Sequence, residues 1–159
     1  MKYDNRYQDL MWELVNHLDA QSDTEEVPVA AMVLNPNLEM LSLATNQRIN
    51  QKDASAHAEI EAIRQAGKKI NNWRLDDYTI LVTLEPCMMC AGAILQSRIS
   101  RVVFGAYETK SGFLISKVNP IREVRPQLEI IGGVLEQECA EVLSKWFKKH
   151  RSSEDILEI

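Results

Sequence analysis

Apolar positions repeat at the spacing of a helix in some segments of the chain and run together, as in buried strands, in others. Residues 6–18 place apolar side chains at one-, three- and four-residue intervals, which predicts an amphipathic helix. Residues 27–34 and 38–44 are mainly apolar runs on either side of an Asn-Pro-Asn sequence, which predicts two strands joined by a tight turn. Residues 78–84 are apolar and β-branched without alternation, a pattern typical of a strand covered on both faces.

Two helices are predicted in the middle of the chain. Ser55 is expected to cap the first, and Gly67 is expected to end it. Pro86 suits the first turn of the second, residues 87–96, because a first-turn amide has no partner within the helix. This second helix is apolar nearly all round, which indicates burial on all sides or a subunit interface.

The remaining pattern completes an α/β arrangement. Strands are predicted at 101–105 and 128–131, and a final helix from 135 to about 150, while 111–126 has no clean period. The alternation of strands and helices predicts a three-layer α/β/α sandwich with a mixed sheet whose first two strands are antiparallel. A length of 159 residues suits a single domain, with its core at 27–151 and a frayed tail at 152–159.

Composition indicates where such a chain works. The longest uncharged apolar run, from Cys87 to Leu95, is far below the roughly 18 residues of a membrane span. The first six residues lack the apolar stretch of a signal peptide. Three cysteines do not form the framework of a disulfide-stapled secreted protein. We therefore expect a cytoplasmic protein that does not interact with a membrane.

The negative net charge is distributed unevenly along the chain. The sequence carries 18 Lys and Arg against 23 Asp and Glu, a net charge of −5, which by itself argues against a nucleic-acid partner. The first 26 residues hold this entire excess of acid, and residues 27–151 carry a net charge of +3. An acidic first helix attached to a mildly basic core is compatible with RNA binding.

Two short motifs carry candidate metal ligands. Cys87 and Cys90 are three residues apart on a predicted helix, so both thiols lie on one face, near a helix N-terminus that favours thiolate. With His57 as a third ligand, Zn²⁺ would keep one tetrahedral position open for water and lower the pKa of that water to about 7. Glu59 is the candidate proton shuttle. Together, H-x-E and P-C-x-x-C form the signature of zinc nucleobase deaminases.

Two other interpretations of the cysteines are open. A C-x-x-C pair alone can form a thioredoxin-like redox site, which gives the His-Ala-Glu motif no role. A closed structural zinc site needs a fourth protein ligand, for which Cys139, His17 and His150 are the candidates. Cys139 lies on the apolar stripe of the last predicted helix, where a cysteine is usually a core residue.

From about Glu26 to Arg151 the sequence resembles the bacterial tRNA-specific adenosine deaminases of the cytidine-deaminase-like superfamily. The resemblance is carried by E-V-P-V at 26–29, A-H-A-E at 56–59, V-T-L-E-P-C-M-M-C-A-G-A at 82–93, S-R-I at 97–99 and R-V-V-F-G-A at 101–106. It implies a five-stranded sheet between helices, a homodimer, one Zn²⁺ per subunit, and conversion of adenosine to inosine at the wobble position of tRNA. The anticodon loop of tRNA is then the expected partner.

The resemblance also implies roles for single residues. His57, Cys87 and Cys90 would bind zinc, and Glu59 would move protons. The implied substrate contacts are Asn46, the backbone of Ala58, Pro28, Glu85, Glu108 and Phe147, the last followed by Lys148, Lys149 and Arg151. Simpler interpretations are a turn residue for Asn46, a turn-orienting carboxylate for Glu85, and a core aromatic beside a solvated face for Phe147.

Several positions depart from the family pattern. Ala30 stands where the family usually has Gly, Glu108 where it has Asp, and Phe-Leu-Ile-Ser at 113–116 replaces a segment of small residues near the RNA. These changes bear on the substrate and not on the zinc chemistry. The alternatives are a deaminase of a free nucleobase or nucleoside, of guanine, cytosine or adenosine type, and a catalytically idle zinc fold that binds RNA or a protein partner.

Overall fold

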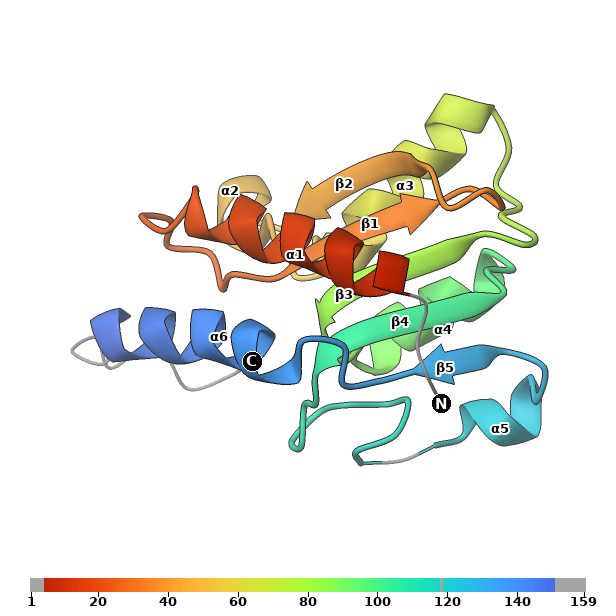
Figure 1. The fold of residues 1–159 in the computed structure, drawn as a ribbon. Coiled ribbons are helices and arrows are strands. Elements are labelled where there is room, and N and C mark those ends of the chain that lie inside the picture. The colour runs from red at the N-terminus through yellow and green to blue at the C-terminus, as the bar shows by residue number, and fades with distance from the viewer. Residues whose placement is uncertain (1–4, 118, 151–159) are drawn as a thin grey trace.

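A five-stranded mixed sheet forms the centre of the molecule (Figure 1). The computed structural model describes residues 5–117 and 119–150, so the predicted tail at 152–159 lies outside it. In spatial order the strands are β2 (Met40–Thr45), β1 (Ala30–Leu34), β3 (Thr79–Leu84), β4 (Arg101–Ala106) and β5 (Glu129–Ile131). β1 pairs antiparallel with β2 and β3, whereas β3, β4 and β5 are parallel. The predicted mixed sheet and hairpin are confirmed.

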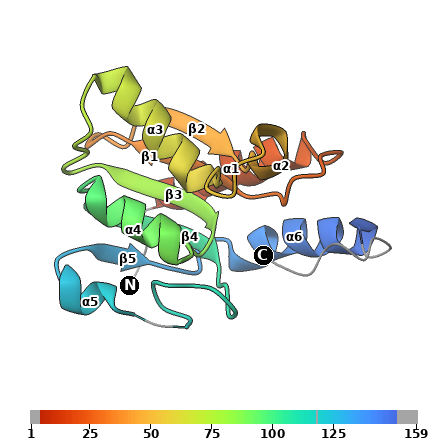
Figure 2. The same cartoon turned by 180° about the vertical axis from the view of Figure 1, so that it is seen from behind.

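Helices cover both faces of this sheet, as the predicted three layers require. α1 (Asn5–Asp19) packs on β1 and β3, and α6 (Glu136–His150) packs on β4 and beside α1. The opposite face carries α3 (Ala58–Ile70) and α4 (Met88–Gln96), which lie side by side in Figure 2. Two single-turn helices, α2 (Arg48–Gln51) and α5 (Ile121–Val124), lie in connections.

Burial on both faces explains the composition of the central strands. Every residue of β1 and β3 is buried, which is why neither strand alternates in sequence. α6 approaches β4 so closely that a Cβ on Gly105 would lie 2.3 Å from the Cys139 sulfur and 2.8 Å from the Thr83 carbonyl oxygen. Cys139 is therefore a core residue, and only glycine fits at 105.

The ends of α3 and α4 differ from the sequence-based prediction. Ser55 does not cap α3, because its hydroxyl bonds to Asp53 at 2.7 Å and the N-cap is His57. The helix runs past Gly67 to Ile70, and ends at Asn71 in the left-handed conformation that asparagine tolerates well. Pro86 precedes α4 instead of lying in its first turn, because the N-cap is Cys87.

In the described part of the chain, no helix is long and apolar enough to cross a bilayer.

Candidate active site

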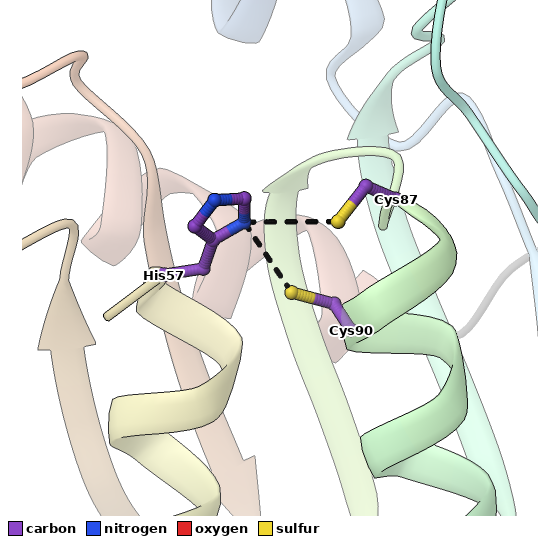
Figure 3. Close-up of side chains that lie close together, drawn as sticks. All are labelled: His57, Cys87 and Cys90. Carbon is purple, nitrogen blue, oxygen red and sulfur yellow. Dashed lines mark hydrogen bonds between the residues drawn. The ribbon is translucent and has the colours of Figure 1, made fainter. Parts of the chain in front are cut away.

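Three predicted metal ligands meet where the N-termini of α3 and α4 come together (Figure 3). His57 is the N-cap of α3, Cys87 is the N-cap of α4, and Cys90 lies in the first turn of α4. The His57 Nδ1 is 3.7 Å from the Cys87 sulfur and 3.5 Å from the Cys90 sulfur. The ligand atoms of the three side chains lie within 4.8 Å of one another, so a single ion can reach all of them.

The donor set fits zinc. One imidazole nitrogen and two cysteine sulfurs are the ligands of a catalytic Zn²⁺ site that keeps a fourth position for water. Among residues 5–117 and 119–150, no fourth His, Cys, Asp or Glu joins the group. Of the candidates for a closed structural site, His17 bonds to Gln21, His150 stacks on Trp146 and Cys139 is buried beside Gly105. A closed four-ligand site is not formed by these residues.

The two thiols share one proton in the protein without metal. A hydrogen bond from Cys90, with further help from His57, lowers the pKa of the Cys87 thiol to about 4. The same hydrogen bond, together with burial, raises the pKa of Cys90. A hydrogen bond with Cys87 also raises the pKa of His57, while the positive charge of Arg48 acts in the opposite direction. Cys87 is thus ready to ligate, and metal binding releases the Cys90 proton.

Glu59 lies in the first turn of α3 and is only 4% exposed. Its burial raises the pKa of the carboxyl to about 7, and the neighbouring His57 acts against this rise. A carboxyl with this pKa can both accept and donate a proton near neutral pH, which is the property required of a general acid and base.

These residues line a pocket that we call the catalytic pocket. Its wall consists of segments from the β1 approach, the β2–α3 connection, the end of β3 and the loop after β4: Val27, Val29, Asn46, Arg48, His57, Glu59, Leu84, Glu85, Cys87, Glu108 and Ser111. Three of the six predicted substrate contacts, Asn46, Glu85 and Glu108, are among them. The pocket therefore joins the metal ligands to half of the predicted substrate residues.

Asn46 braces the start of α3. Its side-chain oxygen accepts the Ala58 N–H at 3.0 Å, and its amide nitrogen donates to the Val27 carbonyl at 3.2 Å. The asparagine thus links the end of β2, the first turn of α3 and the segment before β1. Ala58 is fully buried and its N–H is already bonded, so only other parts of its backbone can meet a substrate.

Glu85 organises the loop that follows β4. Its carboxylate accepts the backbone N–H groups of Glu108, Leu114, Ile115 and Ser116, together with the Ser116 hydroxyl. Burial acts to raise the pKa of Glu85, but the combined hydrogen bonds outweigh it and hold this pKa below its usual value. The interpretation of Glu85 as an orienting carboxylate has direct structural support, whereas a contact with substrate stays a prediction.

The same loop braces the turn that carries Cys87. Phe113 N–H donates to the Pro86 carbonyl at 3.0 Å, and Gly112 forms a β-bridge with Cys87. A Cβ on Gly112 would lie 2.4 Å from the Glu108 carbonyl oxygen and 2.5 Å from Cδ of Glu85. Glycine at 112 therefore lets the loop lie directly against the Glu85 carboxylate.

Comparisons with known proteins agree with this chemistry. The sequence matches the MafB19-like deaminase family over residues 5–151. The tRNA-specific adenosine deaminase of Haemophilus influenzae is 44% identical over 133 residues, covering 82% of this chain and 77% of that protein. The tRNA-specific adenosine deaminase of Bacillus subtilis is 41% identical over 143 residues, covering 89% of this chain and 88% of that protein. This chain belongs to the tRNA-specific adenosine deaminase family.

Solved structures share the fold of this deaminase. A structure from a study of A-to-I editing by tRNA:A34 deaminases at the wobble position of transfer RNA has a TM-score of 0.76 and 32% identity. It covers 84% of this chain and 97% of its own. A guanine deaminase from Nitrosomonas europaea has a TM-score of 0.75 at 20% identity, over 86% of this chain and 81% of its own, and shows the fold alone. The resemblance and the fold class inferred from sequence are confirmed.

Two predicted substrate contacts lie away from the catalytic pocket of this deaminase. Pro28 is buried and lines a separate cavity with Trp146 and Lys149. Its two neighbours, Val27 and Val29, line the catalytic pocket, and successive side chains of an extended segment point to opposite sides. Phe147 lies on α6 with its ring edge against Trp146. Contacts of Pro28 and Phe147 with substrate stay predictions, and Arg151 lies outside the described residues.

Sequence reasoning missed two charged residues of this region. Arg48 lines the catalytic pocket, and Glu26, only 6% exposed, accepts the N–H groups of Ile49 and Asn50 at the start of α2. Arginine is neither a usual metal ligand nor a proton carrier, and Arg48 lies in a polar stretch of the sequence. Glu26 belongs to the E-V-P-V segment that carries the family resemblance and lies directly before the apolar run at 27–34, but neither feature assigns it a role.

Proposed function

We propose that this protein is a zinc-dependent hydrolase that deaminates adenosine to inosine at the wobble position of tRNA. The observation that carries the proposal is the convergence of His57, Cys87 and Cys90 beside the buried carboxyl of Glu59, in a pocket open to solvent. The tRNA-specific adenosine deaminases of two bacteria, more than 40% identical over most of the chain, support tRNA as the substrate. The net charge of +3 over residues 27–151 is compatible with it.

The chain supplies ligands and a proton carrier. His57, Cys87 and Cys90 would hold Zn²⁺, which would supply a Lewis acid able to lower the pKa of a water to about 7. Glu59 would accept a proton from the attacking water and deliver it to N1 of adenine, and would then pass a second proton to the amino group of C6, which leaves as ammonia. The balance is one adenosine and one water consumed, one inosine and one ammonia formed. The target base has to leave its stack to reach the pocket.

We infer further that two copies associate in the cytoplasm through the surface of α3 and α4. Met88 is 65% exposed and Met89 is 37% exposed on α4. A groove runs between the two helices, and its lining combines the apolar Ile60, Ile63, Trp73 and Ala93 with polar and charged residues such as Arg64 and Lys68. Exposed apolar side chains on one face of the molecule favour a protein interface over solvent. The sequence-based interpretation of α4 as a buried or interface helix supports the same surface.

The test is conversion of a tRNA transcript. The zinc-loaded protein is incubated with a tRNA that carries adenosine at the wobble position, and inosine is measured by sequencing. We expect inosine at that position and nowhere else in the transcript. Absence of conversion by fully zinc-loaded protein would overturn the tRNA proposal. Ammonia release from guanine, cytosine or adenosine in a parallel panel would then assign the enzyme to a free base or nucleoside.

A further inference from the structure

Arg48 places a positive charge in the wall of the catalytic pocket. It is the first residue of α2, it is half-buried, and it lines the pocket together with His57 and Glu59. Its guanidinium makes no hydrogen bond or ion pair with any residue that the structure describes, although its charge acts on His57. A pocket-lining arginine with all its donors available is a binding group for an anion.

Glu26 fixes the position of Arg48 without neutralising it. The Glu26 carboxylate accepts Ile49 N–H at 2.7 Å and Asn50 N–H at 2.9 Å, both through Oε1. These bonds replace the side-chain cap that Gln47, the N-cap residue of α2, does not make. At its other side the Arg48 carbonyl accepts Asp53 N–H at 3.1 Å. The backbone that carries Arg48 is therefore held from both ends, while its side chain is available for a ligand.

The charges of the pocket indicate which anion this is. The other charged side chains in the pocket wall are three carboxylates, Glu59, Glu85 and Glu108, besides the metal-ligand set. Adenine and adenosine are neutral and offer an arginine hydrogen-bond acceptors but no negative charge. A nucleotide within RNA carries a phosphate on each side of the sugar, and arginine binds phosphate through two parallel N–H bonds.

We propose that Arg48 binds the backbone phosphate next to the nucleotide whose base enters the catalytic pocket, and that Glu26 is its positioning residue. This proposal rests on the proposed function, because it requires RNA as the substrate. It also explains how the enzyme would distinguish a polynucleotide from a free nucleoside, because only the polynucleotide has the phosphate that Arg48 contacts. Arg48 acts on substrate binding, and the zinc ligands and Glu59 remain the chemical machinery.

The first experiment compares Arg48→Gln with Lys52→Gln. Lys52 is an exposed cation at the other end of α2 and does not line the pocket, so it is a matched control for lost charge. The substrate is an RNA hairpin that carries the anticodon loop. For Arg48→Gln we expect KM to rise about tenfold or more with kcat unchanged. We also expect the slope of log affinity against log salt to become shallower by about 0.7, the value for one phosphate contact in single-stranded RNA.

The control distinguishes a specific phosphate contact of Arg48 from a general effect of positive charge on RNA binding. Lys52→Gln is expected to change KM by less than about twofold, as an exposed charge away from the pocket should. An equal rise in KM in both variants would overturn the proposal. So would an unchanged KM in Arg48→Gln while the wild type converts the hairpin to inosine, an outcome that leaves the proposed function intact.

A binding measurement separates the two proposals when no conversion is seen. Fluorescence anisotropy of the labelled hairpin is followed with Glu59→Ala protein, with and without Arg48→Gln. Weaker binding in the double variant supports the phosphate site even where tRNA deamination fails, and equal binding overturns it. Inorganic phosphate and adenosine 5′-monophosphate are added as competitors. Displacement of the hairpin by inorganic phosphate at the same concentration as the hairpin would show that Arg48 binds free anions, and would overturn the proposed contact with the RNA backbone.

The positioning role of Glu26 has its own readout. Glu26→Ala is expected to raise KM with kcat and zinc content unchanged, and Glu26→Gln, which keeps an acceptor oxygen, is expected to restore most of the loss. In the Arg48→Gln background, Glu26→Ala should add no further rise in KM, because both changes remove one contact. Additive effects would show that Glu26 acts on the whole fold and would overturn its assigned role.

Discussion

His57 and Cys87 occupy the same position, the N-cap, in two neighbouring helices. An N-cap side chain extends beyond the helix end instead of lying along its surface, so these two side chains reach across the space between the helices. Sequence spacing was sufficient to select the three side chains that the structure brings together as candidate ligands. The prediction that Pro86 and Cys87 lie in the first turn of α4 was wrong, because the helix begins at Met88 and Cys87 is its N-cap.

Separate variants should divide metal binding from proton transfer. Glu59→Ala is expected to keep one zinc per chain and to lose about 100-fold to 10,000-fold in kcat, the usual contribution of a general acid and base. Cys90→Ala, which removes a ligand, is expected to lose zinc as well. Metal content is measured by mass spectrometry and turnover by inosine formation. Unchanged turnover in Glu59→Ala would contradict the mechanism.

Replacement of Gly112 by a residue with a side chain should destabilise the protein. In Gly112→Ala the new methyl group meets the Glu108 carbonyl oxygen and the Glu85 carboxylate, so the loop has to move away from the Cys87 turn. We expect a loss of about 1–3 kcal/mol in the free energy of unfolding, the usual cost of overpacking, measured by denaturant titration. A stability equal to wild type would show that this loop adjusts freely.

Among the elements, the sheet was predictable and the loop after β4 was not. β1 and β3 could be recognised in the sequence as uninterrupted apolar runs, because both faces of each strand are covered. Residues 111–126 have no clean period in sequence, and the first part of this stretch is held by one distant carboxylate, Glu85, and not by a repeating apolar face. Long-range bonds of this kind leave no local pattern for sequence reasoning to detect.

The loop that Glu85 holds should loosen in acid. The folded protein lowers the pKa of Glu85, so its stabilising contribution is complete above the ordinary glutamate pKa and is lost as pH falls through the lowered value. Glu85→Gln should produce a similar loosening at neutral pH, at a cost of about 1–3 kcal/mol for weakened bonds to a buried acceptor. Hydrogen exchange at Leu114, Ile115 and Ser116 reports both effects. Protection factors, which are corrected for the intrinsic pH dependence of amide exchange, would contradict the role of Glu85 if they changed neither in acid nor with this substitution.

At the scale of the whole molecule, the two faces differ in what they leave exposed. Trp73 is 63% exposed beside the groove of α3 and α4, and Trp12 is 42% exposed on α1, which covers the opposite face of the sheet. The proposed dimer uses only the first of these surfaces. The two tryptophans therefore form a matched pair for testing it.

Charge introduced at one tryptophan should separate the subunits, and at the other it should not. We expect Trp73→Glu to shift the protein from dimer to monomer at micromolar concentration, because it replaces a large apolar side chain of the groove with a charged one that has to be desolvated in the interface. Trp12→Glu should remain dimeric. Light scattering coupled to size-exclusion chromatography measures both masses. A monomeric wild type, or dissociation by the α1 substitution alone, would place the contact elsewhere.

The close approach of α6 to Gly105 has a consequence for how the chain is made. All five strands precede α6 in sequence, so the ribosome adds every strand to the chain before it adds the helix that covers β4. During each round of synthesis the apolar surface at β4 is briefly open to water and to other nascent chains. Packing of Cys139 against Gly105 then covers the apolar surface of β4. A chain interrupted before Glu136 would leave that surface exposed to the cell's chaperones.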